Sequence, residues 1–211
     1  MSRNWRVVAI CTCLLAGATG AHAQGLAPLQ AKLSDVYSKM LGRALPTIAT
    51  GEATMLEASG RKDEAAKLLA AADKMKQGAN QQPDEKLWKA SITSVSDGAN
   101  TASDTLSTKA GQLSDSAKKQ FIVGLAQYVD GEVQLKGMKE DASQLAGLIG
   151  GATQGLSMMD AMRARGTINL AKTVSTGVPD IAAKSLTGLQ AIKAFAASRS
   201  IQIPADLLQR M

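Results

Sequence analysis

A seven-residue repeat of apolar and glycine positions constrains the fold of this chain more than any other feature. It runs from residue 121 to residue 159 in alternating steps of three and four. Its members are Phe121, Gly124, Tyr128, Gly131, Leu135, Met138, Ala142, Leu145, Ile149, Ala152, Leu156 and Met159. A repeat sustained over this length is typical of long helices that pack side by side at shallow angles. We therefore expect long, antiparallel helices in this part of the chain.

The rest of the chain keeps the same helical spacing and shows no strand-like alternation. One helical face is formed by Leu26, Leu29, Leu33, Val36 and Met40. Residues 91–116 are rich in Ser and Thr, a composition that is also typical of flexible linkers. Their apolar residues nevertheless step by three and four, and this spacing predicts a helix with a narrow apolar seam. The sequence therefore predicts an all-α fold without a sheet, an antiparallel up-and-down bundle of about five or six helices.

Glycine and proline residues mark where we expect some of these helices to end. Pro46 should kink or break the first helix, because proline has no backbone N–H and its ring clashes with the preceding turn. Gly60 is typical of a residue that ends a helix. In residues 175–180, Gly177 predicts the end of one helix and Pro179 the start of another.

The amino terminus has the three-part pattern of a secretory signal peptide. A short basic segment precedes an apolar stretch, and Ala21 and Ala23 then form a cleavage site of small residues. The apolar stretch is shorter than the roughly 20 residues that span a bilayer. We therefore expect residues 1–23 to be removed and residues 24–211 to form a single domain that is periplasmic or secreted.

Removal of this segment takes away the cysteines and the single histidine of the chain, Cys11, Cys13 and His22. The mature chain then lacks the thiolate and imidazole groups on which Ser-His-Asp and Cys-His catalysis depend. The same groups are the favoured ligands of zinc, iron–sulfur and haem sites. No pair of carboxylates stands out as an acid–base couple. We therefore predict no catalytic, metal-binding or cofactor-binding residues.

The charge pattern argues against nucleic acid as a partner. The formal net charge of +6 falls to +4 without the two arginines of the signal peptide, and the remaining basic residues are dispersed rather than clustered. Aromatic side chains, on which single-stranded nucleic acids stack, are scarce in residues 24–211: Tyr37, Trp88, Phe121, Tyr128 and Phe195.

The segment GLIGGATQGLSMM, residues 147–159, places four glycines inside the helical pattern. A phosphate-binding loop would need a preceding strand and a Lys after the last glycine, and neither is present. Gly147, Gly151 and Gly155 are spaced by four and form a ridge of minimal side chains opposite the apolar seam. Such a ridge lets two backbones approach closely, so we expect it to pack against another helix.

Two alternatives remain for this segment. Gly150 and Gly151 are also typical of the turn in a helical hairpin, because glycine interrupts helices. Residues 142–159 carry no charged side chain, as expected of a segment that contacts lipid. Their Ser, Thr and Gln residues are too polar for a helix that spans the membrane.

Met158, Met159 and Met162 follow the glycines directly. Thioethers bind Cu(I) in exported proteins, and they are also adaptable fillers of hydrophobic cores. Because no His or Cys assists, we interpret this cluster as part of the core. Met158 and Met162 share a helix face, and we assign them with the glycine ridge to a helix-packing or interaction site.

Function is inferred mainly from what the mature chain lacks. We expect an exported, non-enzymatic binding, scaffold or chaperone-like protein that acts through its helical surfaces on a protein partner or on a second copy of itself. The alternative is a protein that interacts with a membrane surface through residues 142–159. An enzyme that works with carboxylates, or with Ser and Lys alone, is the least favoured function.

Overall fold

The computed structural model describes residues 26–108, 113–154 and 156–211. Over these residues the chain is almost entirely helical and contains no strand, which confirms the predicted all-α class. The expected signal peptide, with its two cysteines and its histidine, lies outside the described residues, and so does Gly155.

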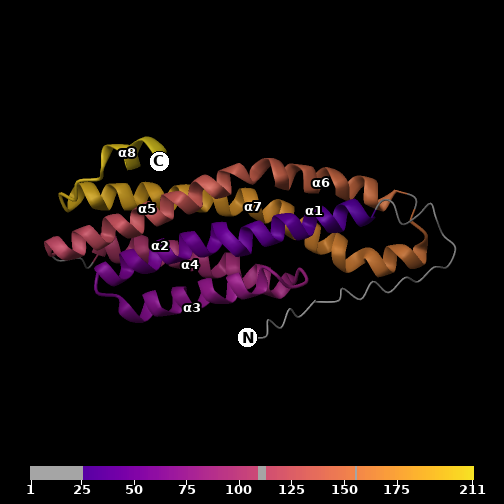
Figure 1. Cartoon of the computed structure of the whole chain (residues 1–211), viewed down its shortest axis with the longest axis horizontal. Coiled ribbons are helices and arrows are strands. Elements are labelled where there is room, and N and C mark those ends of the chain that lie inside the picture. Colours follow the sequence, from indigo (N-terminus) through magenta and orange to yellow (C-terminus); the bar gives the residue numbers. More distant parts are fainter. Residues whose placement is uncertain (1–25, 109–112, 155) are drawn as a thin grey trace, which may run out of the picture.

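The helices follow one another along a common long axis. In chain order they are α1 (Leu26–Lys39), the π-helix η1 (Met40–Ala44), α2 (Leu45–Ala58), α3 (Lys62–Gly78), α4 (Glu85–Thr108), α5 (Asp115–Gly137), α6 (Lys139–Thr153), α7 (Met158–Ser198) and α8 (Ala205–Arg210). The segments α1, η1 and α2 form one continuous helical rod. The described residues therefore form six such rods and the short helix α8. The chain runs up and down the length of the molecule, as the sequence predicts, with α6 continuing in the direction of α5 (Figure 1).

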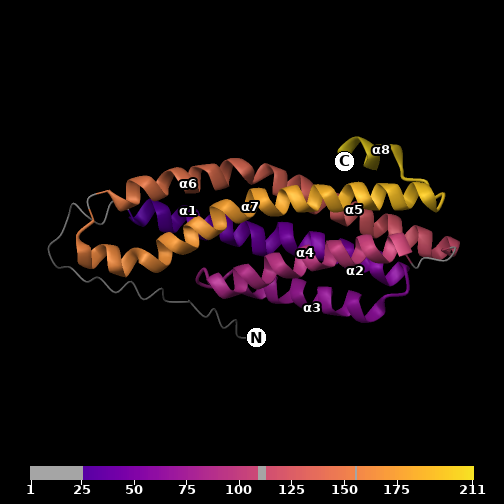
Figure 2. The same ribbon diagram turned by 180° about the vertical axis from the view of Figure 1, so that it is seen from behind.

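The bundle has a thick end and a narrow arm (Figures 1 and 2). At the thick end α2 packs against α3, α4 and α5, and α7 packs against α4 and α5. In the arm only three rods remain: α1, α6 and the first part of α7, which contact one another. The arm therefore leaves more of each helix surface uncovered than the thick end does.

Two helices approach each other backbone to backbone at the thick end, α2 and α5. A Cβ added at Gly51 would lie 2.6 Å from the backbone nitrogen of Tyr128, and one added at Gly124 would lie 2.8 Å from the carbonyl oxygen of Gly51. A Cβ added at Gly131 would lie 2.9 Å from the backbone nitrogen of Ile48. These glycines are needed because any side chain would separate the two helices.

The first rod passes Pro46 without ending there. The π-helix η1 lies just before this proline, and the backbone N–H of Leu45 bonds to the carbonyl oxygen of Met40. A π-turn inserts one residue into the helical register, which accommodates a proline that has no N–H to contribute. The chain stays helical through Pro46, so the predicted break is wrong, and a local π-turn precedes the proline instead.

The helix α7 also continues through residues 175–180, so the predicted end at Gly177 and new start at Pro179 are wrong. Its 41 residues include Pro179 in the interior. Gly177 lies against the buried indole of Trp88 from α4, and an added Cβ would be 3.2 Å from Nε1. Packing against α4 holds this segment helical although its local propensity favours a break.

Candidate functional site

The residues that the sequence assigns to helix packing or interaction belong to the end of the narrow arm, where α6 turns into α7 (Figure 2). We call residues 147–165, apart from residue 155, the hairpin tip. Gly147, Gly151, Met158 and Met162 lie within it. Gly155, the remaining residue of the assigned set, lies outside the described residues.

Gly147 and Gly151 face open space. Both are exposed, and a Cβ added at either position would meet no atom within 4 Å. The buried face of α6 is formed instead by Ala142, Leu145 and Ala152. The expected close packing of the ridge is therefore wrong for these two glycines within the described chain, because the three-rod arm supplies no helix to cover them. Their contact with another molecule stays a prediction.

A helical hairpin is present, but its turn does not lie at the glycine pair that the sequence suggested. The helix α6 continues through Gly150 and Gly151, and α7 begins at Met158. The hydroxyl of Ser157 accepts a hydrogen bond from the backbone N–H of Asp160 at 3.2 Å and donates one to the Asp160 carboxylate at 2.6 Å. This amino-terminal cap sets the start of α7.

The methionines of the hairpin tip are exposed to solvent, which corrects their interpretation as core residues. The exposed fraction is 86% for Met158, 74% for Met162 and 65% for Met159. They occupy the first two turns of α7. Their exposure has the same cause as that of the glycines, since no further helix of the described chain covers this end of the arm.

Positive charge borders these methionines. Residues 142–159 carry no charged side chain, and Arg163 and Arg165 follow at exposed positions of α7. Within the part of the chain that the structure describes, neither arginine forms an ion pair. The hairpin tip therefore combines exposed methionines with Asp160, which accepts a hydrogen bond from Ser157, and with two arginines that form no ion pair among the described residues.

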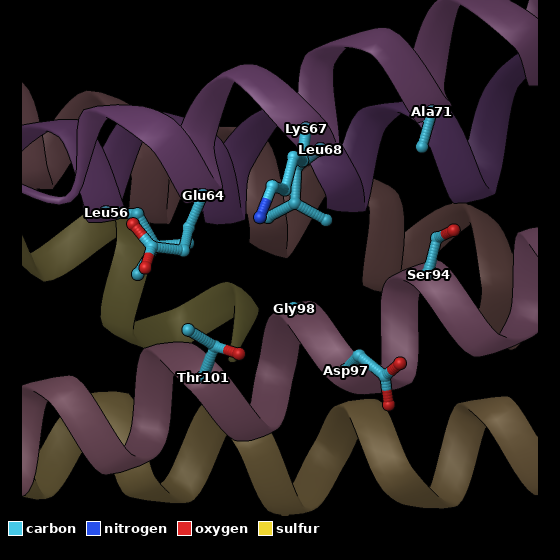
Figure 3. Close-up of a pocket in the computed structure, with 9 residues that line it drawn as sticks. All are labelled: Leu56, Glu64, Lys67, Leu68, Ala71, Ser94, Asp97, Gly98 and Thr101. Carbon is cyan, nitrogen blue, oxygen red and sulfur yellow. The ribbon is translucent and has the colours of Figure 1, made fainter.

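A second candidate is a groove between α3 and α4, drawn in Figure 3. It encloses about 300 Å³ and is lined by Leu56, Glu64, Lys67, Leu68, Ala71, Ser94, Asp97, Gly98 and Thr101. Side chains of the two helices face each other across it, and they include both signs of charge. Glu64 is held in an ion pair with Arg61. The groove thus has a mixed polar rim above buried leucines.

A buried carboxyl group lies behind this groove. Glu52 of α2 is fully buried, and neither of its carboxyl oxygens has a hydrogen-bond partner among the described residues. Its Oε2 occupies the space next to Gly98, so a Cβ added there would overlap it. Burial raises the pKa of Glu52 well above its ordinary value, because a charged carboxylate is poorly solvated in the interior.

Glu132 of α5 is a second buried carboxyl group without a hydrogen-bond partner in the described residues. Burial raises its pKa to about 7, and the charges of Lys136 and Lys139 oppose the rise. One turn earlier, Tyr128 donates a hydrogen bond to the carbonyl oxygen of Ser185 at 2.8 Å. Burial raises the pKa of the Tyr128 phenol, and the nearby carboxyl groups add to the rise.

Sequence reasoning missed both glutamates. Glu52 directly follows Gly51, and Glu132 directly follows Gly131. Both glycines lie where α2 and α5 come into close contact. The glycine that directly precedes each glutamate was the available signal. The described residues contain no group of three or more His, Cys, Asp or Glu side chains that would hold a metal ion.

Comparisons with known proteins do not place the chain in a family. No family model matches it, and no curated protein and no solved structure was found to match it. None of the described helices is long and apolar enough to cross a membrane. The fold and the site define the class of protein as an all-α bundle with an exposed apolar hairpin tip.

Proposed function

We propose that this chain is an exported, non-enzymatic binding or scaffold protein that holds a protein partner on its hairpin tip. Export is supported by the signal-peptide pattern of residues 1–23. Binding is supported above all by the exposure of Met158, Met159 and Met162. Clustered large apolar side chains on a surface mark interaction sites more often than single ones do.

The chemistry of the hairpin tip suits partner binding. Removing one methionine side chain from water contributes about 1.5–3 kcal/mol, and the flexible thioether adapts to partners of different shape. Gly147 and Gly151 leave the neighbouring surface of α6 flat, so a partner helix can approach its backbone closely. A Cβ added at either glycine would meet nothing within the described chain, so this part of α6 is free to contact another chain.

Charge specifies the partner further. Arg163 and Arg165 lie beside the methionines and form no ion pair within the described residues. A partner with an apolar face bordered by Asp or Glu would complement both the methionines and the arginines. We therefore propose that the bound element is an acidic amphipathic helix of another protein.

A lipid surface is the second candidate, because residues 142–159 carry no charge. The described hairpin tip contains no Trp or Tyr, the residues that anchor helices at membrane interfaces. One face of α6 is also already buried in the arm, which reduces the apolar area left for lipid. These two observations favour the protein partner.

The test replaces the apolar surface and keeps the fold. We compare Met158→Ser/Met159→Ser/Met162→Ser with Val123→Ser/Val133→Ser, a control that removes exposed apolar side chains from α5. The mature protein is used to capture partners from the exported fraction, and each captured protein is then purified and titrated. We expect a partner that binds the wild type and the control but not the methionine variant. Arg163→Glu/Arg165→Glu should weaken the same binding.

Other outcomes lead to other functions. A partner that binds the methionine variant as tightly as the wild type would place the binding surface elsewhere. Co-sedimentation with vesicles of phosphatidylglycerol and phosphatidylethanolamine, lost in the methionine variant, would establish the lipid function instead. Dimerisation that depends on concentration and is lost in that variant would identify a second copy of the chain as the partner.

A further inference from the structure

We propose that Met158, Met159 and Met162 form a binding site for one Cu(I) ion at the hairpin tip. This inference goes beyond the docking function, because it assigns a role to the three sulfur atoms and not only to the apolar surface. It is carried by the distribution of methionine in the structure, by helix geometry and by the chemistry of the donor atoms.

Exposed methionines are confined to this one place among the described residues. Elsewhere methionine is buried or half-buried: Met40, Met55, Met75, Met138 and Met211. A docking surface can use the flexible methionine side chain, although leucine or isoleucine would provide similar apolar area. What leucine and isoleucine lack is a soft donor atom, and the three exposed thioethers provide three of them within five residues.

Helix geometry makes Met162 a neighbour of both Met158 and Met159. Met158 and Met162 are four residues apart, and Met159 and Met162 are three apart, so their Cβ atoms are neighbours at about 5–6 Å. Each side chain has three rotatable bonds, and the exposed fractions of 65–86% leave them free of packing restraints. The sulfur atoms can converge on one ion without any change in the core.

The donor set selects the metal. Thioether sulfur is a soft ligand that prefers Cu(I), whereas zinc and Cu(II) favour imidazole or thiolate and magnesium favours oxygen. The described hairpin tip contains no His or Cys. Its acidic side chain, Asp160, already accepts a hydrogen bond from Ser157 at 2.6 Å. The adjacent Asp160 carboxylate offsets the positive end of the α7 dipole, whereas Arg163 and Arg165 add positive charge to the tip. The affinity for Cu(I) therefore has to come from the soft sulfur donors and not from the charge of the site.

The first experiment measures Cu(I) binding directly. The mature protein is titrated with Cu(I) under anaerobic conditions, with ascorbate present and bicinchoninate as the competing ligand. We expect the wild type to withdraw one equivalent of Cu(I) from bicinchoninate and Met158→Leu/Met159→Leu/Met162→Leu to withdraw none. Met211→Leu is the matched control and should bind like the wild type. Zn(II), titrated in parallel, should not bind at the tip.

The leucine variant also separates this site from the docking function. Leucine preserves the apolar surface and removes sulfur, so partner binding should persist in this variant while Cu(I) binding is lost. The serine variant should lose both. If partner binding depends on the methionines but the protein takes up no Cu(I), the metal site is overturned and the docking function remains supported.

A second experiment locates the ion. In protein labelled with carbon-13 at the methionine methyl groups, Ag(I) serves as a diamagnetic soft cation. We expect shifts of the signals from Met158, Met159 and Met162 only. The proposal is overturned if the wild type takes up no Cu(I), if the leucine variant binds it equally well, or if Ag(I) shifts other methionine signals instead. Circular dichroism checks that each variant keeps its helices.

Discussion

The carboxyl group of Glu52 lies against Gly98, so α2 and α4 meet where a glycine faces a buried carboxyl group that has no hydrogen-bond partner among the described residues. A Cβ at position 98 would overlap the Oε2 atom of Glu52 and lie 2.9 Å from Cδ2 of Leu68. The glycine therefore provides the space in which the carboxyl group is buried. Gly98 and Leu68 also line the α3–α4 groove (Figure 3), so this contact lies just behind the groove.

Gly98→Ala should destabilise the protein by about 1–3 kcal/mol through overpacking, although alanine is the better helix former by up to about 1 kcal/mol. In a Glu52→Ala background most of the cost should disappear, because the overlapping carboxyl group is gone and only the close contact with Cδ2 of Leu68 remains. Urea unfolding of the two single variants and the double variant measures the coupling. Gly166→Ala is the control, since a Cβ there meets nothing within 4 Å. An equal cost of Gly98→Ala in both backgrounds would contradict the contact.

The stability of the protein should fall as the pH rises through the titration of Glu132. Its pKa is raised by burial from 4.5 to about 7 in the folded state. The contribution of this group is therefore fully present below pH 4.5 and is lost by about pH 7, since only the unfolded state ionises easily between these values. Over this pH range the free energy of unfolding should fall by roughly 3 kcal/mol.

Glu132→Gln tests this pH dependence, because the amide cannot ionise. The free energy of unfolding of the variant should vary less between pH 4.5 and 7 than that of the wild type, as measured by urea unfolding at several pH values. The remaining slope reports other groups, including Glu52, whose pKa burial also raises. An unchanged slope in the variant would show that Glu132 is already ionised in the folded protein.

Alanine substitutions at Gly151 and Gly124 should have opposite effects. Gly151→Ala fills open space on α6 and should stabilise the protein by about 0.5–1 kcal/mol, since alanine loses less backbone entropy. Gly124→Ala should destabilise it, because the new Cβ would lie 2.8 Å from the carbonyl oxygen of Gly51. Thermal melts compare the melting temperature of each variant with that of the wild type. A lower melting temperature for Gly151→Ala would mean that something covers α6 in solution.

Pro179→Ala should raise stability by about 1 kcal/mol or more, because proline inside a helix removes one backbone hydrogen bond and crowds the preceding turn. This expectation depends on α7 being continuous through Pro179. Hydrogen exchange should show slower exchange around residue 179 in the variant. Loss of stability would instead indicate that proline starts a new helix there, where its fixed φ is favourable.

The helical class could be predicted from the sequence because helix formation is largely local. The spacing of Ile92 and Val95 within a Ser- and Thr-rich stretch predicts a helix, and α4 contains both residues. The seam residues Phe121 and Leu145 are buried as their period requires. Each of these inferences needs only the geometry of one helix, in which residues three and four apart share a face.

Which helix surfaces are covered by another helix could not be predicted from the sequence and is seen only in the tertiary structure. Gly151 and Gly124 look alike in sequence, yet one is open and the other touches the backbone of α2. Met158 is exposed for the same reason that Gly151 is, and Glu52 is buried because α4 lies over it. Helical periodicity states which side chains share a face, but whether another helix packs on that face depends on residues far away in the chain.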